Sequence, residues 1–415
     1  MFSKHKFNNK QRELSVINKF WIGFILYTLG YILSVIINLN PFIRVTFQSF
    51  GLLIIILNAI NLIHFNFDNI YLKITAIIYY LWLSSVVIRG FLLEKEFIKI
   101  MIFDPFEGLF VYFVPLIVIF SKNIYYYKKM FETISALCVS FIIFCLFFFT
   151  TLINRDISDL SAQAALEYSS KSLSISSGFL LLTYIYHSNK RKFLAFFAIA
   201  LTLMFSIIKA RRGLVFMAGF PLIMLVIFHF LNYRKGYSNR LSLILIIIIL
   251  FVTTYFYIGT IQPANYGVFS SIVDRTDEDT RSEVVQYFYD DMSTTDWVIG
   301  KGINGQYFCP TDEGQMYRNG IESDYLNIIL KGGIIRLGLE LLILIPAVFK
   351  GLFYSKNMLS KASGVWILFY LLCLYPSPNT KFILFYLIVW TSVAICYSKK
   401  IRELSDESLI EYFHP

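Results

Sequence analysis

The sequence predicts an all-α, polytopic integral membrane protein with about twelve transmembrane helices. Of the 415 residues, 57% are hydrophobic and only 15% are charged, whereas a soluble domain averages roughly 25% charged residues. Apolar runs long enough to cross a bilayer recur along the chain. Much of the remaining polar character gathers in one stretch, residues 262–338. This pattern excludes a soluble globular protein.

Each apolar run is assigned as one span, because about 20 helical residues cross the hydrocarbon core. The first run, residues 20–39, is long enough to span and lacks a small-residue cleavage site, so no cleavable signal peptide is expected. The fourth and eleventh runs are the shortest. The predicted spans are residues 20–39, 47–64, 70–88, 108–121, 133–153, 172–187, 193–208, 213–231, 241–261, 324–349, 363–376 and 381–397.

The basic residues predict the orientation, because connections rich in Lys and Arg stay in the cytoplasm. Basic connections follow the fourth, sixth, eighth and tenth spans, on the same side as the basic N-terminus and the basic tail. Both termini are therefore predicted to be cytoplasmic, and the large loop between the ninth and tenth spans to be extracytoplasmic. The same pattern explains the net charge of +10 without nucleic-acid binding.

The large loop divides the chain into three predicted parts. Residues 1–261 form an N-terminal membrane bundle of about nine helices. Residues 262–323 form the extracytoplasmic loop, and residues 324–415 form the C-terminal membrane helices and a cytoplasmic tail. Only Cys309, of the five cysteines, lies in the loop, so no disulfide is expected there. We expect an impermeant thiol reagent to reach Cys309 from outside.

One connection breaks the charge rule. Lys209, Arg211 and Arg212 fall between the seventh and eighth spans, on the predicted outer side. Either a span is miscounted, or these charges serve an anionic ligand at the outer face. Arginine suits a diphosphate because its planar fork donates two charge-assisted hydrogen bonds. The Ser-rich run 169–177 is interpreted as the start of the sixth helix and not as a site.

Four short motifs, in order, resemble the O-antigen polymerase and O-antigen ligase superfamily, the Wzy-type membrane glycosyltransferases. ARRGLVF (210–216) resembles the Ser-Arg-Gly turn of that family, and TRSEVVQYF (280–288) resembles its loop Gly-Arg followed by an amphipathic helix. DWVIGKGING (296–305) is similar to its P-L-F-G-x-G turn, and ESDYLNIILKGGII (322–335) to its H-N-x-Y-L…G-x-x-G helix start. These motifs cover about a third of the chain, and the first six spans match only in hydropathy.

The resemblance implies roles for particular residues. Arg212 falls on the first arginine of the family and Arg281 on its loop arginine, while Arg211 takes the serine position. Glu322 stands where the ligases have histidine, and Arg336 replaces the second glycine of the helix start. The missing histidine argues against a ligase. The resemblance also implies a GT-C-like architecture.

The chemistry of such a transfer can be argued from the residues themselves. A leaving diphosphate gathers negative charge, which fixed arginines such as Arg212 and Arg281 stabilise. The acceptor hydroxyl must lose its proton to a positioned carboxylate, for which Glu322 or the neighbouring Asp324 is suited. The candidate residues for binding diphosphate or glycan are Arg211, Arg89, Asp324, Tyr325 and Lys301.

Each of these residues also has a plainer interpretation. A loop arginine such as Arg281 is often only a solvated charge, and Glu322 or Asp324 could simply cap the helix that follows. The acidic residues of 274–279 lack the glycine and terminal glutamate of an EF-hand, and they fit a solvated turn. Arg336 and Glu340, spaced i and i+4, could form an ion pair within the bilayer.

The predicted function is polymerisation of polyprenyl-diphosphate-linked oligosaccharide repeat units, as in O-antigen, capsule or exopolysaccharide, at the outer face of a bacterial inner membrane. The enzyme would be a metal-independent glycosyltransferase without a cofactor. No nucleotide-binding loop is visible, so undecaprenyl-diphosphate-linked oligosaccharide is expected as donor and acceptor. The expected partners are therefore lipid-linked oligosaccharide and the membrane. A chain-length regulator protein is a further candidate partner, and no nucleic acid is expected.

Two alternatives remain open. One is an O-antigen ligase that transfers glycan to a lipid A-core acceptor. The other is a flippase or transporter for the same glycolipids, for which we would expect paired charges near the bilayer midplane and a repeat between the two halves of the chain.

Overall fold

A computed structural model gives the fold of residues 2–37, 40–65, 67, 69–120, 123–154, 160–232, 280–312 and 315–413. These residues are mostly helical, which confirms the prediction of a helical membrane protein at this level. Six of the described helices are long and apolar enough to cross a membrane: Gln11–Ser34, Phe42–Leu62, Ile70–Gly90, Ile124–Phe147, Asn189–Ile208 and Arg212–Phe230.

The helices form two compact units, each described by itself. Unit 1 comprises residues 1–133 and 280–415, and unit 2 comprises residues 134–279. The helix α5 (Ile124–Phe147) begins in unit 1 and ends in unit 2. The sequence analysis divided the chain into three consecutive parts by hydropathy. The contacts in the structure instead group the N-terminal helices with the C-terminal ones in unit 1.

Unit 1 begins with a closely packed helix pair, α1 (Phe2–Ile37) and α2 (Pro41–Leu62). A Cβ on Gly51 would lie 2.7 Å from the backbone nitrogen of Tyr27, so the pair depends on a small residue there. Asn40 caps α2 by accepting from the N–H of Phe42, and Pro41 occupies the first turn, where its missing N–H costs nothing.

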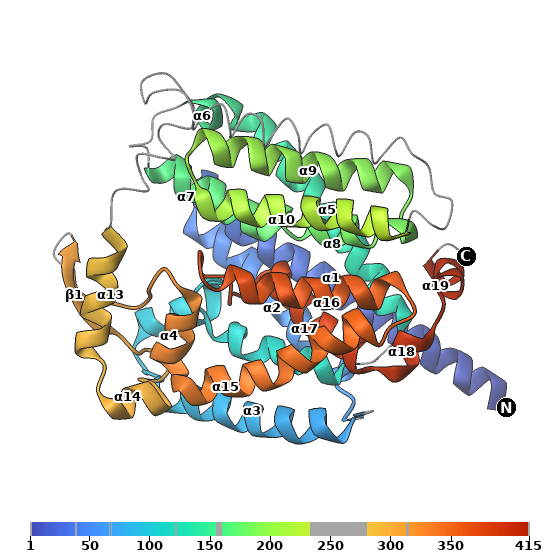
Figure 1. Cartoon of the computed structure of the whole chain (residues 1–415), viewed down its shortest axis with the longest axis horizontal. Helices are drawn as coiled ribbons and strands as arrows, with labels where there is room; N and C mark the ends of the chain where they lie inside the picture. The colour runs from blue at the N-terminus through green and yellow to red at the C-terminus, as the bar shows by residue number, and fades with distance from the viewer. Residues whose placement is uncertain are drawn as a thin grey trace. The chain divides into compact units, whose positions relative to one another are not determined.

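The core of unit 1 is formed by α3 (Ile70–Gly90), α15 (Asp324–Phe353), α16 (Met358–Cys373) and α17 (Leu384–Tyr397), which pack against one another. Figure 1 shows α15 beside α3. Every residue of α17 is buried, which explains why its sequence is apolar on all sides. Outside the large loop, the unit also contains the start of α5, α4 (Lys95–Phe103), the 3-10 helix η1 (Leu109–Ile119), α18 (Lys399–Glu403) and α19 (Asp406–Phe413).

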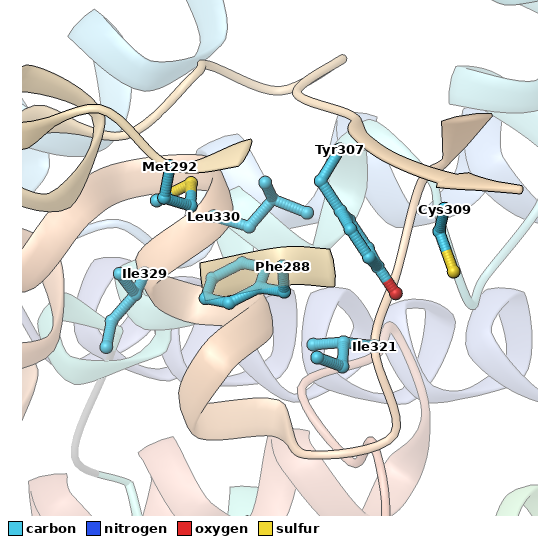
Figure 2. Packing of buried hydrophobic residues seen from close by; sticks show 7 residues of the cluster. All are labelled: Phe288, Met292, Tyr307, Cys309, Ile321, Ile329 and Leu330. Atoms are coloured by element: carbon cyan, nitrogen blue, oxygen red, sulfur yellow. The ribbon is translucent and has the colours of Figure 1, made fainter. Parts of the chain in front are cut away.

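The described part of the large loop has a hydrophobic core of its own. It contains α13 (Thr280–Asp291), α14 (Thr294–Ile299) and an antiparallel hairpin of β1 (Tyr307–Asp312) and β2 (Gln315–Arg318), which the sequence analysis did not predict. Figure 2 shows how α13, β1 and α15 bury side chains against one another. The buried cluster is Phe288, Met292, Tyr307, Cys309, Ile321, Ile329 and Leu330.

Cys309 is part of this cluster, and its exposed fraction is 0%. The expectation that an impermeant reagent reaches Cys309 is therefore wrong, because β1 turns this side chain into the core of the loop. The other four cysteines are also buried. An introduced cysteine is needed to test the orientation.

We expect a Thr295→Cys variant to react with an impermeant maleimide in intact spheroplasts, because Thr295 is exposed on α14 in the predicted outer loop. The matched control is Lys190→Cys, exposed at the start of a predicted cytoplasmic connection, which should react only after lysis. Labelling is read by mass shift on a gel. The opposite pattern would invert the topology.

Unit 2 contains the rest of α5 and seven further elements among the described residues. A π-helix, η2, forms in the Ser-rich run, because its side chains bond across to α9: the Ser174 hydroxyl lies 2.5 Å from that of Thr202. The elements are α6 (Phe149–Ile153), α7 (Leu160–Ser169), η2 (Ser170–Ser174), α8 (Ser177–Leu182), the 3-10 helix η3 (Tyr184–Tyr186), α9 (Asn189–Ile208) and α10 (Arg212–Asn232).

Several predicted spans are not single continuous helices. Residues 172–187 are divided among η2, α8 and η3, and residues 108–121 contain the short 3-10 helix η1. Residues 324–349 lie in α15, which is interrupted at Gly333. The ninth span, 241–261, falls outside the described residues. The total of twelve spans and the GT-C-like architecture therefore stay predictions.

Candidate functional site

The Gly-Lys-Gly turn of the loop docks onto the backbone of α15. Gly300 and Gly302 have φ of 74° and 84°, a region that glycine occupies readily. The N–H of Lys301 donates to the carbonyl of Leu330 (2.7 Å), and that of Gly302 to the carbonyl of Lys331 (3.0 Å). Two consecutive N–H groups of the turn thus donate to two consecutive carbonyls of α15, and these bonds tie the loop to that helix.

The docking coincides with a break in α15. Gly333 has φ of 70° and ψ of 178°, so the helix stops and restarts at this residue. A Cβ on Gly300 would lie 2.5 Å from the backbone nitrogens of Gly332 and Gly333, so the close approach requires glycine. The indole N–H of Trp82 on α3 donates to the carbonyl of Gly332 (2.8 Å), which satisfies an acceptor at the break.

Arg89 and Lys301, two predicted binding residues, lie on either side of this turn. Arg89 donates from Nη1 to the carbonyl of Gly300 (2.9 Å) and from Nη2 to that of Ile299 (2.7 Å), where a cation suits the end of α14. Lys301 Nζ lies 2.5 Å from Asp291 Oδ2. Both side chains therefore hold the loop in place, and their role toward a ligand stays a prediction.

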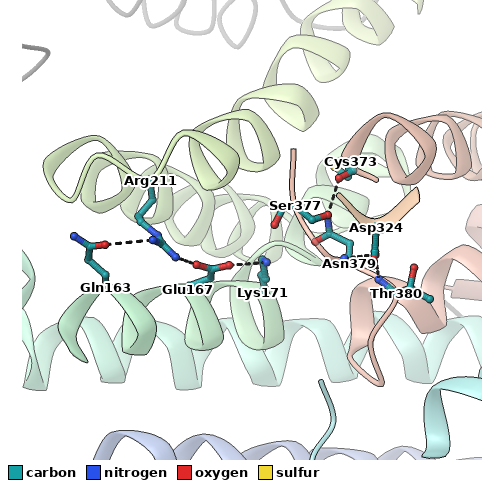
Figure 3. Close-up of polar contacts among 9 residues, drawn as sticks. All are labelled: Gln163, Glu167, Lys171, Arg211, Asp324, Cys373, Ser377, Asn379 and Thr380. Atoms are coloured by element: carbon teal, nitrogen blue, oxygen red, sulfur yellow. Dashed lines mark hydrogen bonds and ion pairs between the residues drawn. The ribbon is translucent and has the colours of Figure 1, made fainter. Parts of the chain in front are cut away.

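The two candidate bases have opposite surroundings. Asp324 is 2% exposed, and its Oδ2 accepts the backbone N–H groups of Asn379 and Thr380, each at 2.5 Å (Figure 3). Its Oδ1 also lies 3.4 Å from Asn327 Nδ2. Glu322, two residues earlier, is exposed. Asp324 therefore fixes the turn before α17, while the carboxylate of Glu322 is accessible to solvent.

Other predicted residues at this end of unit 1 have structural contacts or lie partly outside the description. The Tyr325 hydroxyl donates to the carbonyl of Leu371 (2.7 Å), which joins α15 to α16. Arg281 lies in the first turn of α13, and only its backbone is described. Burial raises the pKa of Tyr307 to about 12, and the negative charge of Glu322 adds to this effect. Tyr307 is therefore a neutral core residue of the loop near pH 7.

Unit 2 contains the predicted basic turn, between α9 and α10. Ala210 has φ of 53°, an uncommon value for a residue with a Cβ. The N–H of Arg211 donates to the carbonyl of Ser206 (2.8 Å), which closes the turn over the end of α9. This conformation begins α10 at Arg212, which is exposed.

Arg211 belongs to a chain of polar contacts with α7 and η2 (Figure 3). Its Nη2 forms an ion pair with Glu167 Oε2, and its Nη1 donates to Gln163 Oε1 (3.2 Å). Glu167 Oε1 also binds Lys171 Nζ at 2.7 Å. Lys171 is 2% exposed. Among the described residues, one carboxylate is therefore shared between two cations.

Lys209 lies two residues before Arg211, at the end of α9. Its side chain is 0% exposed, and its Nζ has no hydrogen-bond partner among the described residues. A buried ammonium without an acceptor is unusual, because an unpaired buried charge is costly. Lys171 and Arg211 contact Glu167, and Lys209 and Arg212 flank Arg211 in the chain. We define these five residues as the basic cluster of unit 2.

The sequence analysis missed Glu167 and Lys171 of this cluster. It assigned the Ser-rich run to the start of a helix, and the run does form one, but a π-helical one. The available signal was the i, i+4 spacing of Glu167 and Lys171, which places both on one helix face. A π-helical turn of this kind often occurs at functional sites.

The predicted site residues fall into both units. Arg211 and Arg212 belong to unit 2, whereas Arg89, Lys301, Glu322, Asp324 and Tyr325 belong to unit 1, as does the backbone of Arg281. Among the described residues, no three His, Cys, Asp or Glu side chains come together as metal ligands would. The acidic turn 274–279 lies outside the described residues.

No family model, no curated protein and no solved structure matches the chain. The resemblance to the O-antigen polymerase and ligase superfamily therefore depends on the four short motifs alone.

Proposed function

We propose that this protein is a bacterial inner-membrane glycosyltransferase that polymerises oligosaccharide repeat units linked to polyprenyl diphosphate. The observation that carries the proposal is the basic cluster of unit 2. It combines Lys209, a buried ammonium without an acceptor in the described part of the chain, with a second buried ammonium, Lys171, and with Arg211. Such a cluster in a membrane-embedded unit suits an anion that a lipid brings with it, and a diphosphate matches the arginine fork.

The reaction requires one bond exchange. The acceptor hydroxyl oxygen attacks the anomeric carbon of the donor sugar, and the bond from that carbon to the diphosphate oxygen breaks. The electron pair leaves with the diphosphate, whose growing charge the cations of the cluster stabilise. The hydroxyl proton passes to a carboxylate, and Glu322 is the better candidate because it is exposed while Asp324 is hydrogen-bonded and buried.

The proposal is tested with purified protein in nanodiscs and a lipid-linked repeat unit as the only substrate. Polymerisation predicts a ladder of lipid-linked products that increase by one repeat unit. A strain without the protein should then carry single-repeat glycan. Loss of all attached polymer in that strain would indicate the ligase instead.

Chelation is expected to leave the activity intact, because the proposal assigns the neutralisation of the diphosphate to arginine and lysine. We would measure the product ladder in excess EDTA, with a magnesium-supplemented reaction as the control. If activity requires a divalent ion, the leading role passes from the basic cluster to the acidic turn 274–279.

A second candidate function is transport of the same glycolipids. It is favoured by the break in α15 at Gly333, together with Arg336 and Glu340, which are both buried on the same helix. Discontinuous helices with buried charges are typical of secondary transporters. Accumulation of lipid-linked units on the cytoplasmic face of a strain without the protein would support transport over polymerisation.

A further inference from the structure

Arg336 is buried beside the break in α15. It is 4% exposed, and its side chain extends back over Gly332, where an added Cβ would lie 2.6 Å from Arg336 Cβ and 3.0 Å from Cγ. The guanidinium carbon lies 4.9 Å from the ring centroid of Tyr112 on η1. The aromatic face supports the cation on one side, and the hydroxyl of the same tyrosine interacts with the guanidinium.

The carboxylate nearest to Arg336 along α15 acts on it electrostatically, but its oxygens bind other groups. Glu340, one turn further along α15, accepts the hydroxyls of Tyr79 (3.0 Å) and Tyr370 (2.9 Å). Among the described residues, no carboxylate lies within ion-pair distance of Arg336, so the simple i, i+4 pair does not form. Arg336 Nε has no hydrogen-bond partner in the same part of the chain. Unit 1 thus buries a guanidinium with an unused donor.

The break adds a second feature that favours an anion. After Gly333 the helix restarts at Ile334 and continues to Phe353, so the positive end of a long helical segment lies next to Arg336. Arginine and a helix start together are a suitable combination for a phosphate group. Because residues 324–349 of α15 are a predicted membrane span, we expect an anion to reach this position most readily when it is attached to a lipid.

We propose that Arg336 and the restart of α15 bind the phosphate group of a polyprenyl-linked lipid, at a site separate in sequence and in unit from the basic cluster. The inference rests on the proposed function in one respect. Polymerisation requires two lipid diphosphates at the same time, the donor and the acceptor, and one cationic site in each unit would supply a place for both.

The test uses undecaprenyl diphosphate without sugar as the probe, so that no reaction can occur. Native mass spectrometry of the full chain counts the bound molecules. We expect two molecules on the unaltered protein and one on R336A, whereas R336K should retain the second with at least tenfold weaker affinity. The matched control is R402A, because Arg402 donates to the backbone carbonyl of Tyr354 and should not affect binding.

A second variant keeps the charge and changes its position. G332A places a methyl group where the Arg336 side chain lies, so it should lower the second binding event as R336A does. Melting temperatures identify variants that do not fold. If R336A does not fold, binding of the second lipid molecule to G332A tests the proposal instead. Two molecules bound to every folded variant would overturn the proposal.

The source of the anion is distinguished by two further probes. Undecaprenol, which lacks phosphate, should not occupy the site, and equal binding of undecaprenol would exclude an anion site. Inorganic pyrophosphate should not displace the lipid, and displacement that depends on Arg336 would assign the site to a free phosphate instead. Failure of polymerisation with intact, Arg336-dependent lipid binding would remove only the proposed function, whereas polymerisation with Arg336-independent binding would remove only this inference.

Discussion

Replacing Arg212 by alanine should lower the rate of polymerisation by about 10²–10³-fold, the usual effect of removing one donor that stabilises a developing negative charge. Arg212 begins α10 and is exposed, so its removal should not disturb the core of unit 2. Arg212→Lys should restore little activity, because an ammonium cannot donate two parallel hydrogen bonds. The measurement is the initial rate of ladder formation from purified lipid-linked repeat units, normalised to the amount of protein.

Arg281→Ala is expected to have a similar effect, and Lys190→Ala is the matched control because it removes an exposed charge of unit 2 from the other end of α9. Normal rates in both arginine variants would remove the arginines from the reaction. A normal rate in Arg281→Ala alone would mean that this loop arginine is only a solvated charge.

Glu322→Gln should lower the rate by about 10²-fold or more while the melting temperature stays unchanged. The substitution keeps the size and the capping ability of the side chain but removes the proton acceptor. Glu322 is exposed, so little packing depends on its charge. We would measure the rate across pH together with the melting curve of the purified variant.

Asp324→Asn should lower the melting temperature and leave the rate unchanged. The reason is that Asp324 is buried and accepts the backbone N–H groups of Asn379 and Thr380. Asparagine keeps one acceptor oxygen but removes the charge from hydrogen bonds that are worth about 1.5–3 kcal/mol to a charged group, and its NH2 group cannot accept from Asn327. This variant should therefore melt at a lower temperature and retain its rate where it is folded. An unchanged rate in Glu322→Gln with a lost rate in folded Asp324→Asn would move the base to Asp324.

The sequence predicted helices where hydropathy decides the structure, and it failed where tertiary contacts decide it. The pairs Gly300–Gly302 and Gly332–Gly333 are visible in the sequence, but their mutual docking depends on contacts between α14 and α15. Cys309 was expected to be accessible because it lies in a polar loop. The loop has its own apolar core, however, whose residues are too dispersed along the chain to form a recognisable period.

The candidate site shows the same division. The basic turn at Arg211 and Arg212 could be singled out because it opposes the charge rule for membrane connections. Glu167 and Lys171 could not be identified from the sequence as partners of this turn, because their arrangement depends on the register of the π-helix that follows α7. Glu322 and Asp324 are equivalent in sequence, and only the position of Asn379, more than fifty residues later, distinguishes them.

The construction of unit 1 from both ends of the chain has a consequence for its biogenesis. Arg89 and the carbonyl of Gly300 are separated by 211 positions, so the hydrogen bond between them cannot form until the loop has been synthesised. At roughly 5–20 residues per second, this interval lasts about 10–40 seconds. Throughout it, the guanidinium of Arg89 and the indole N–H of Trp82 lack their final acceptors. A nascent chain arrested before residue 300 is therefore expected to remain a substrate for membrane chaperones or proteases.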